Sequence, residues 1–161
     1  MTVEEYNMCV DEFSDNVFRF ALKNIRDEDK ARDIVQDSYE KLWIKKDNVL
    51  YEKAKSYLFT TAYHTFIDIT RKEKRQTAFD EMSSDSYSHS EQYSDLNELL
   101  HEAINQLPAI QKSVILLRDY EGYSYQEIAE ITNLNESQVK VYIYRGRMFL
   151  KKYIGSLEAV I

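Results

Sequence analysis

The segment YQEIAEITNLNESQVKVYIYRGRMFLKKY, residues 125–153, decides the fold. Ser124 stands just before it, and Glu127 follows three positions later, which is a capping-box pattern that opens a short helix. Asn133 comes where a tight turn needs a positive φ, a conformation that Asn tolerates better than most residues. Asn135 then caps a second, longer helix. Two helices joined by so short a turn form a helix-turn-helix.

The second helix of this pair has the character of a DNA-reading helix. Against one acid, Glu136, it carries five bases, a local charge of +4: Lys140, Arg145, Arg147, Lys151 and Lys152. The apolar residues of the shared inner face are Ile128, Leu134, Val139 and Ile143. Such a helix enters the major groove with its N-terminal residues at base edges. A plain helical hairpin has the same spacing, but the caps, the small Ala129 and the basic helix together favour the DNA-binding motif.

The composition favours a helical protein without metal or cofactor. The 161 residues hold 21 Lys+Arg and 28 Asp+Glu, a net charge of −7, and 43% are apolar. Three glycines and one proline are too few for hairpin-rich β structure, whose turns consume them. A single Cys9 excludes a disulfide framework, and no Cys/His grouping has zinc-ligand spacing. No apolar run reaches signal-peptide length or the roughly 18 residues of a membrane span, so we expect a cytoplasmic protein.

Charge and composition divide the chain into two domains. After the basic run at 71–75, residues 76–100 hold six acids and no base and become rich in Ser and Asp. Such a stretch buries too little surface to offset its ordering entropy, so 77–93 is predicted to be a flexible acidic linker. Domain 1–76 is expected to contain three helices, the first opened by a capping box of Thr2 and Glu5. The later two are expected at about 28–46, where the spacing puts Leu42 and Trp43 on the apolar side, and at about 53–74. Domain 94–161 is expected to contain four. The predicted fold class is all-α.

Residues 104–154 resemble region 4 of the bacterial sigma-70 family, most of all the small extracytoplasmic-function (ECF) sigma factors. They follow the family order of a Leu-Pro break, an apolar helix, a Gly-Tyr-Ser turn, Glu-Ile-Ala, and Val-Lys leading to an Arg-rich end. DIVQD at 33–37, followed by Leu42-Trp43, resembles region 2.2. YLF at 57–59 through Ile67-Asp68 and Arg71-Lys72 resembles regions 2.3–2.4. The resemblance therefore covers nearly the whole chain, with its motifs in the family order.

The resemblance implies a transcription initiation factor, with no catalytic residue of its own, that directs core RNA polymerase to promoter DNA. Asp33, Gln36 and Asp37 would bind the bacterial core polymerase, although an ordinary solvated helix face explains the same pattern without the family match. The residues that would melt and capture the −10 element are Thr60, Tyr63, His64, Arg71 and Lys72. His64 stands where the family usually has Asn, which changes the donors and acceptors offered to a base. A DNA-capturing loop would lie near 47–55.

In the last helix the resemblance assigns four residues to the −35 element: Lys140, Val141, Tyr144 and Arg145. Gly146, where the family often has Ala, is expected to weaken the helix by about 1 kcal/mol. The net charge of −7 predicts weak DNA binding without polymerase. An anti-sigma factor, often membrane-anchored, is a common partner in the family, and no small-molecule substrate is expected. The alternative is a stand-alone helix-turn-helix regulator that binds palindromic duplex DNA as a dimer.

Overall fold

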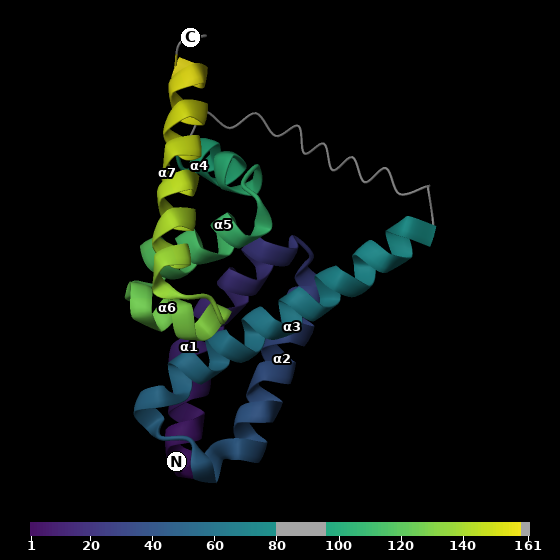
Figure 1. Ribbon diagram of the computed structural model, residues 1–161. Coiled ribbons are helices and arrows are strands. Elements are labelled where there is room, and N and C mark those ends of the chain that lie inside the picture. Colours follow the sequence, from purple (N-terminus) through teal and green to yellow (C-terminus); the bar gives the residue numbers. More distant parts are fainter. Residues whose placement is uncertain (80–95, 159–161) are drawn as a thin grey trace.

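The fold is entirely helical wherever the computed structural model describes the chain, which is over residues 1–79 and 96–158 (Figure 1). In chain order the elements are α1 (Val3–Ile25), α2 (Glu28–Lys45), the 3₁₀ turn η1 (Lys46–Asn48), α3 (Tyr51–Phe79), α4 (Leu96–Asn105), α5 (Ala109–Ile115), the π turn η2 (Leu116–Tyr120), α6 (Tyr125–Thr132) and α7 (Glu136–Glu158). The predicted all-α class is confirmed. No helix of the described ranges is long and apolar enough to cross a membrane.

Helices α1, α2 and α3 form a three-helix bundle with a shared apolar core. The predicted capping box opens α1: Thr2 Oγ1 accepts from the Glu5 amide at 3.1 Å, and the Glu5 carboxylate accepts from the Thr2 amide at 2.9 Å. Asp27 caps α2 by accepting from the Lys30 amide at 3.1 Å. The largest fully buried side chains of the bundle are Val17, Ile34, Leu42, Leu58 and Phe59.

Helix α3 is longer than the sequence predicts. It begins at Tyr51 rather than 53 and ends at Phe79 rather than near 74, so it runs past the predicted start of the linker at 77. Contacts hold its last turns: Glu73 pairs with Lys30 of α2, and the Thr77 hydroxyl donates to the Glu73 carbonyl at 2.8 Å. The other residues of the predicted linker, 80–93, lie outside the described residues.

Helices α4 to α7 follow the predicted order and local signals. The break at Leu107-Pro108 precedes α5, which continues through η2 to a turn at Gly122 with φ +74°. Ser124 and Glu127 form the predicted capping box at the start of α6. Asn133 has the predicted positive φ, 59°, and the Asn135 side chain accepts from the Gln138 amide at 2.7 Å to cap α7. The helix-turn-helix is therefore formed by α6 and α7.

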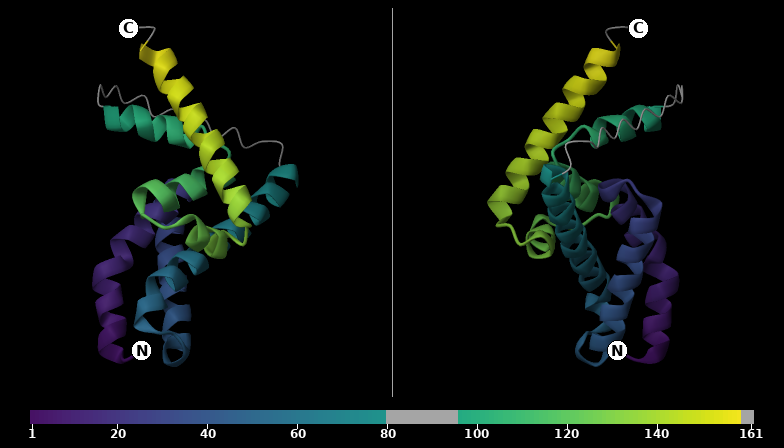
Figure 2. Two further views of the ribbon diagram at one scale, coloured as in Figure 1. Left: turned by 60° about the vertical axis from the view of Figure 1, so that its left-hand side comes forward. Right: turned by 90° about the vertical axis from the view of Figure 1, so that its right-hand side faces the viewer.

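The second group of helices packs on the first, with α6 against α3 and α5 near the C-terminal end of α1. In the two views of Figure 2, α7 leads away from the three-helix bundle. Phe59 of α3 and Tyr123, in the turn before α6, meet edge-to-face with ring centroids 5.5 Å apart. We call this packing of α6 on α3 the closed arrangement.

Polar contacts also link the two groups of helices. Arg19 of α1 forms an ion pair with Glu121 at 2.7 Å. The Ser113 hydroxyl of α5 donates to Asn24 Oδ1 of α1 at 2.7 Å, and both residues are buried. Because the residues that meet are far apart in the sequence, nothing in the sequence pattern predicted these contacts.

Candidate nucleic-acid interface

The outer face of α7 presents a compact set of polar and apolar side chains. Val139 and Ile143 are buried, whereas residues 140, 141, 144 and 145 are exposed. Val141 is 44% and Tyr144 66% exposed, and Lys140 and Arg145 are exposed beside them. All four predicted −35 residues therefore share the solvent-facing side of one helix. A hollow of about 320 Å³ lies here, lined by Asn135, Ser137, Gln138, Val141, Tyr142 and Arg145.

Ser137 is the exposed residue of this face that sequence analysis missed. It lies in the first turn of α7, four residues before Val141. This spacing places the two residues on the same side of a helix, and it is the sequence signal that could have identified Ser137. Gln138 also lines the hollow, but its side-chain oxygen accepts from the Asn135 amide at 3.0 Å. It therefore helps to form the cap at the start of the helix.

Some basic side chains of α7 form ion pairs within the protein, and others do not. Arg147 pairs with Asp119 of η2 at 2.6 Å, and this hydrogen bond raises the pKa of Arg147. Lys140 forms an ion pair of 3.6 Å with Glu136 and lies 5.6 Å from the Tyr125 ring centroid. Within the described part of the chain, no ion pair involves Arg145. Its five guanidinium donors are therefore available to an external acceptor.

The predicted −10 residues lie on α3, but they do not all reach its surface. His64, Arg71 and Lys72 are exposed and Thr60 is half-buried. Tyr63 is only 5% exposed, and its ring meets His64 edge-on with centroids 5.5 Å apart. Burial raises the pKa of Tyr63. The buried Tyr63 ring therefore packs against the exposed His64 ring.

The predicted DNA-capturing loop at 47–55 is shorter than expected. Only residues 49 and 50 separate η1 from α3, and Tyr51 already begins the helix. The Tyr51 hydroxyl donates to Glu12 Oε2 of α1 at 3.0 Å, which fixes the start of α3 against the first helix. Glu12 lies 39 positions before Tyr51, so no local sequence pattern could indicate this contact.

The acidic patch predicted for polymerase binding lies on α2. Asp33 and Gln36 are exposed. Asp37 is held in place, since its carboxylate accepts from the Thr65 hydroxyl at 3.1 Å and pairs with Lys41 at 3.0 Å. These contacts still leave the Asp37 side chain 38% exposed.

Farther along α2, Trp43 does not belong to the buried side as the spacing suggested. It is 45% exposed because the buried stripe ends at Leu42. Its ring rests edge-on against Tyr6 of α1 at 5.0 Å. Ile44 and Leu50 are exposed nearby in the sequence, so the end of α2 has an apolar surface that we had not predicted.

The described residues offer no cluster suited to metal binding. Within residues 1–79 and 96–158, no group of three His, Cys, Asp or Glu side chains is arranged to hold a metal ion. Cys9 is buried, and burial raises the pKa of its thiol. A thiol in that state is a poor nucleophile.

Comparison with known proteins identifies the family. Sequence models of sigma-70 region 2 and of sigma-70 region 4 match residues 9–76 and 97–150. The chain is 32% identical over 146 residues to RNA polymerase sigma factor SigV of Bacillus subtilis (strain 168), covering 89% of this chain and 87% of that protein. It is 27% identical to ECF RNA polymerase sigma factor SigM of the same organism, covering 94% of each.

The fold agrees with this match. Among solved structures, the sigma factor RpoE in complex with the anti-sigma factor NepR from Bartonella quintana superposes with a TM-score of 0.80 at 27% identity. The match covers 95% of this chain and 98% of that one. The regions matched by the two sequence models contain the three surfaces described above, on α2, α3 and α7. The chain therefore belongs to the sigma-70 family, as an ECF sigma factor, and is a transcription initiation factor that directs core RNA polymerase to promoters.

Proposed function

We propose that this sigma factor reads the −35 element with α7, captures the −10 strand with α3 and binds core polymerase through α2. The chain then comprises an N-terminal unit that ends with α3 at Phe79, an acidic linker after it, and unit 94–161. The observation that carries it is the outer face of α7, where the available Arg145 stands beside exposed Val141 and Tyr144. A basic helix with such a face is what the major groove accommodates.

At the −35 element, Arg145 donates two hydrogen bonds to a guanine edge, and Lys140 holds a phosphate or a base edge. A bidentate arginine–guanine pair discriminates by about 1–3 kcal/mol. Val141 and Tyr144 supply apolar contact, for instance to a thymine methyl group. The ion pair of Arg147 with Asp119 supports this role, because it fixes the helix that carries the reading residues.

At the −10 element, α3 presents a ring and two cations to single-stranded DNA. The exposed His64 ring lies on the flipped base, with Thr60 one turn before it. Arg71 and Lys72 neutralise phosphates of the captured strand. The edge-on contact with the buried Tyr63 ring limits the rotation of the His64 imidazole, which suits a fixed readout of one base. Because an imidazole stands where the family usually has an amide, the preferred base differs from that of the common family motif.

At the polymerase, Asp33, Gln36 and Asp37 offer acceptors to basic residues of the core enzyme. Charge-assisted hydrogen bonds of this kind fix orientation as well as affinity. Asp37 is already oriented by Thr65 and Lys41, so less side-chain entropy is lost on binding. We further propose that Trp43 and Ile44 extend this contact with apolar surface.

We also propose that the factor is not an enzyme and acts in the cytoplasm, where its polymerase and promoters are found. The polymerase performs the chemistry, and the factor recognises and opens the promoter. The resemblance to RpoE, which was solved with the anti-sigma factor NepR, supports an anti-sigma partner for this chain as well.

The test is start-site-specific transcription with bacterial core polymerase that lacks any sigma factor, using a pool of promoter fragments. New discrete 5′ ends are expected with the native factor, and they vanish with Arg145→Ala or with the Asp33→Ala/Gln36→Ala pair. Lys151→Ala is the matched control, since it removes the same charge from a different face of α7 and keeps the pattern of start sites. Tight duplex binding without polymerase, and no core-dependent initiation, would overturn the proposal in favour of a stand-alone regulator.

A further inference from the structure

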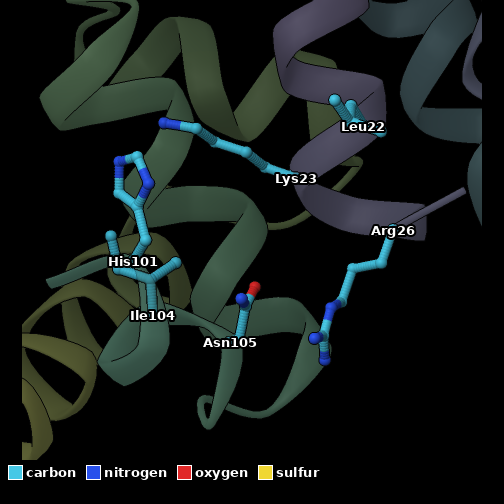
Figure 3. A pocket seen from close by; sticks show the side chains of 6 residues that line it. All are labelled: Leu22, Lys23, Arg26, His101, Ile104 and Asn105. Atoms are coloured by element: carbon cyan, nitrogen blue, oxygen red, sulfur yellow. The ribbon is translucent and has the colours of Figure 1, made fainter. Parts of the chain in front are cut away.

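A cavity of about 230 Å³ opens between α1 and α4, away from the three surfaces assigned above. It is lined by Leu22, Lys23, Arg26, His101, Ile104 and Asn105. Lys23 and Arg26 both reach across from the end of α1 toward α4, Lys23 beside His101 and Arg26 beside Asn105 (Figure 3). Side chains from both helical groups therefore form one pocket with basic groups on its walls.

A third cation contacts Asn105, one of the residues that line this pocket. Lys112 of α5 is only 6% exposed, and its ammonium donates to Asn105 Oδ1 through a long contact of 3.5 Å. Burial, and then the charge of Arg26, lower the pKa of Lys112 to about 8. A buried ammonium normally has a carboxylate partner, because its dehydration is otherwise uncompensated.

Among the described residues, no acid forms an ion pair with the pocket's lysine and arginine side chains or with Lys112. Glu121 is the carboxylate that acts on Lys23, but it is already paired with Arg19 at 2.7 Å. The Lys23 ammonium instead lies over the Tyr120 ring, 3.6 Å from its centroid. Two cations, Lys23 and Arg26, thus line a hollow whose other polar lining groups are an amide and an imidazole, and Lys112 adds a third positive charge through its contact with Asn105.

We propose that this cavity binds a small phosphate-bearing anion, of the size of pyrophosphate or the diphosphate of a nucleotide. Arginine forms paired hydrogen bonds with phosphate oxygens, and lysine adds point charge. The volume lies below the roughly 300–1,000 Å³ of pockets for drug-sized ligands, which favours a compact anion. The Asn105 amide donates to the same anion while its oxygen keeps Lys112 in place.

A ligand here would stabilise the closed arrangement, because its contacts come from α1 on one side and α4 on the other. At a concentration about ten times its Kd, a ligand that binds only the closed form raises the ratio of closed to open molecules by about elevenfold. This consequence for regulation rests on the proposed function, whereas binding itself does not.

Isothermal titration calorimetry on the full chain tests binding, with orthophosphate, pyrophosphate and ADP as separate arms and sodium chloride of matched ionic strength as the blank. We expect saturable binding with pyrophosphate or ADP favoured over orthophosphate. Lys23→Gln and Arg26→Gln should each weaken it by about tenfold, the loss of one charge-assisted contact. Lys45→Gln, which removes an exposed charge at the far end of α2, is the control and should leave the Kd unchanged.

Amide chemical shifts of the native chain give a second measurement that does not depend on heat of binding. Pyrophosphate should shift the resonances of residues 22–26 and 101–105 and leave those of α7 in place. Equal affinity in the native chain and both pocket variants would overturn the proposal, as would shifts spread over the basic face of α7. Tighter binding of ADP than of pyrophosphate identifies a nucleotide as the ligand, and the reverse identifies an inorganic polyphosphate.

Discussion

The close approach of α7 to α5 makes Gly146 a sharp test of the packing described here. From the sequence, Gly146→Ala should stabilise the protein by about 1 kcal/mol, because Ala is the better helix former. In the structure, an added Cβ at 146 overlaps Ile115 Cδ1 and lies 3.4 Å from Ile115 Cγ1. Ile115 is fully buried, so its methyl group has no open space to enter. Overpacking of this kind costs about 1–3 kcal/mol, so the net effect is a loss of about 1 kcal/mol.

The assay is urea unfolding followed by circular dichroism, applied to a double-mutant cycle. Ile115→Val removes the overlapping Cδ1 atom at a cost of about 0.5–1.5 kcal/mol. Gly146→Ala in that background should be neutral or stabilising, which gives a coupling energy of about 1–2 kcal/mol. Gly155→Ala is the control in the same helix, since a Cβ there meets nothing within 4 Å. The reasoning is refuted if Gly146→Ala stabilises the native background as much as the Ile115→Val background.

Three further predictions follow from buried and exposed polar groups. Lys112→Met should stabilise the protein at pH 7 by up to about 3 kcal/mol, since burial lowers the Lys112 pKa from 10.5 to about 8. Between pH 8 and 10.5 the unfolded chain binds more protons than the folded chain, so the stability of the native protein rises over that range. The stabilisation by Lys112→Met therefore shrinks as the pH rises. Equal differences in unfolding free energy between variant and native protein at pH 7 and pH 10 would contradict this. Asn24→Ala leaves the buried Ser113 hydroxyl without its acceptor, which should lower the free energy of unfolding by about 1–3 kcal/mol. The variant should also have a larger radius of gyration in X-ray scattering. An unchanged radius would rule out a role of this hydrogen bond in the closed arrangement. His64→Asn should keep core-dependent initiation but change the preferred −10 sequence in a randomised promoter pool, and an unaltered preference would remove His64 from base reading.

Local signals were predictable from the sequence because their causes lie within a few residues. The caps at Thr2 and Ser124 and the positive φ of Asn133 each depend on one side chain and its neighbouring backbone, and all three are confirmed. The helix-turn-helix follows from them, because caps and a turn fix where α6 ends and α7 begins. The four residues predicted for the −35 element also share the outer face of α7, since their helical spacing sets that face.

Features that depend on distant residues were not predictable. Tyr63 has the spacing of an exposed reader on α3, yet it is buried, and Trp43 has the spacing of a core residue, yet it is half-exposed. In both helices, the packing of neighbouring helices decides how wide the buried stripe is. Helical periodicity in the sequence shows which residues share a side, but it does not show how wide the buried part of that side is. Gly146 is the clearest example. From the sequence it is expected only to weaken the helix, whereas in the structure it allows α7 to pack closely against Ile115.

The closed arrangement bears directly on how the two reading surfaces can act together. The −10 and −35 elements are about 25 base pairs apart by their positions, which at 3.4 Å per pair is about 85 Å. Helix α3, with 29 residues, is only about 44 Å long, and α6 rests against it. The closed factor therefore cannot reach both elements at once, and the contacts between its two helical groups must break on the promoter. The Arg19–Glu121 pair is not an ordinary surface pair, because the arginine side chain is 44% exposed but the Glu121 side chain is only 2% exposed, so the carboxylate depends on its partner in the closed arrangement. The other links are the buried Asn24–Ser113 hydrogen bond and the Phe59–Tyr123 contact. Binding to polymerase and promoter must therefore supply the free energy of opening. This cost is a second reason, besides the net charge of −7, to expect weak DNA binding by the factor alone.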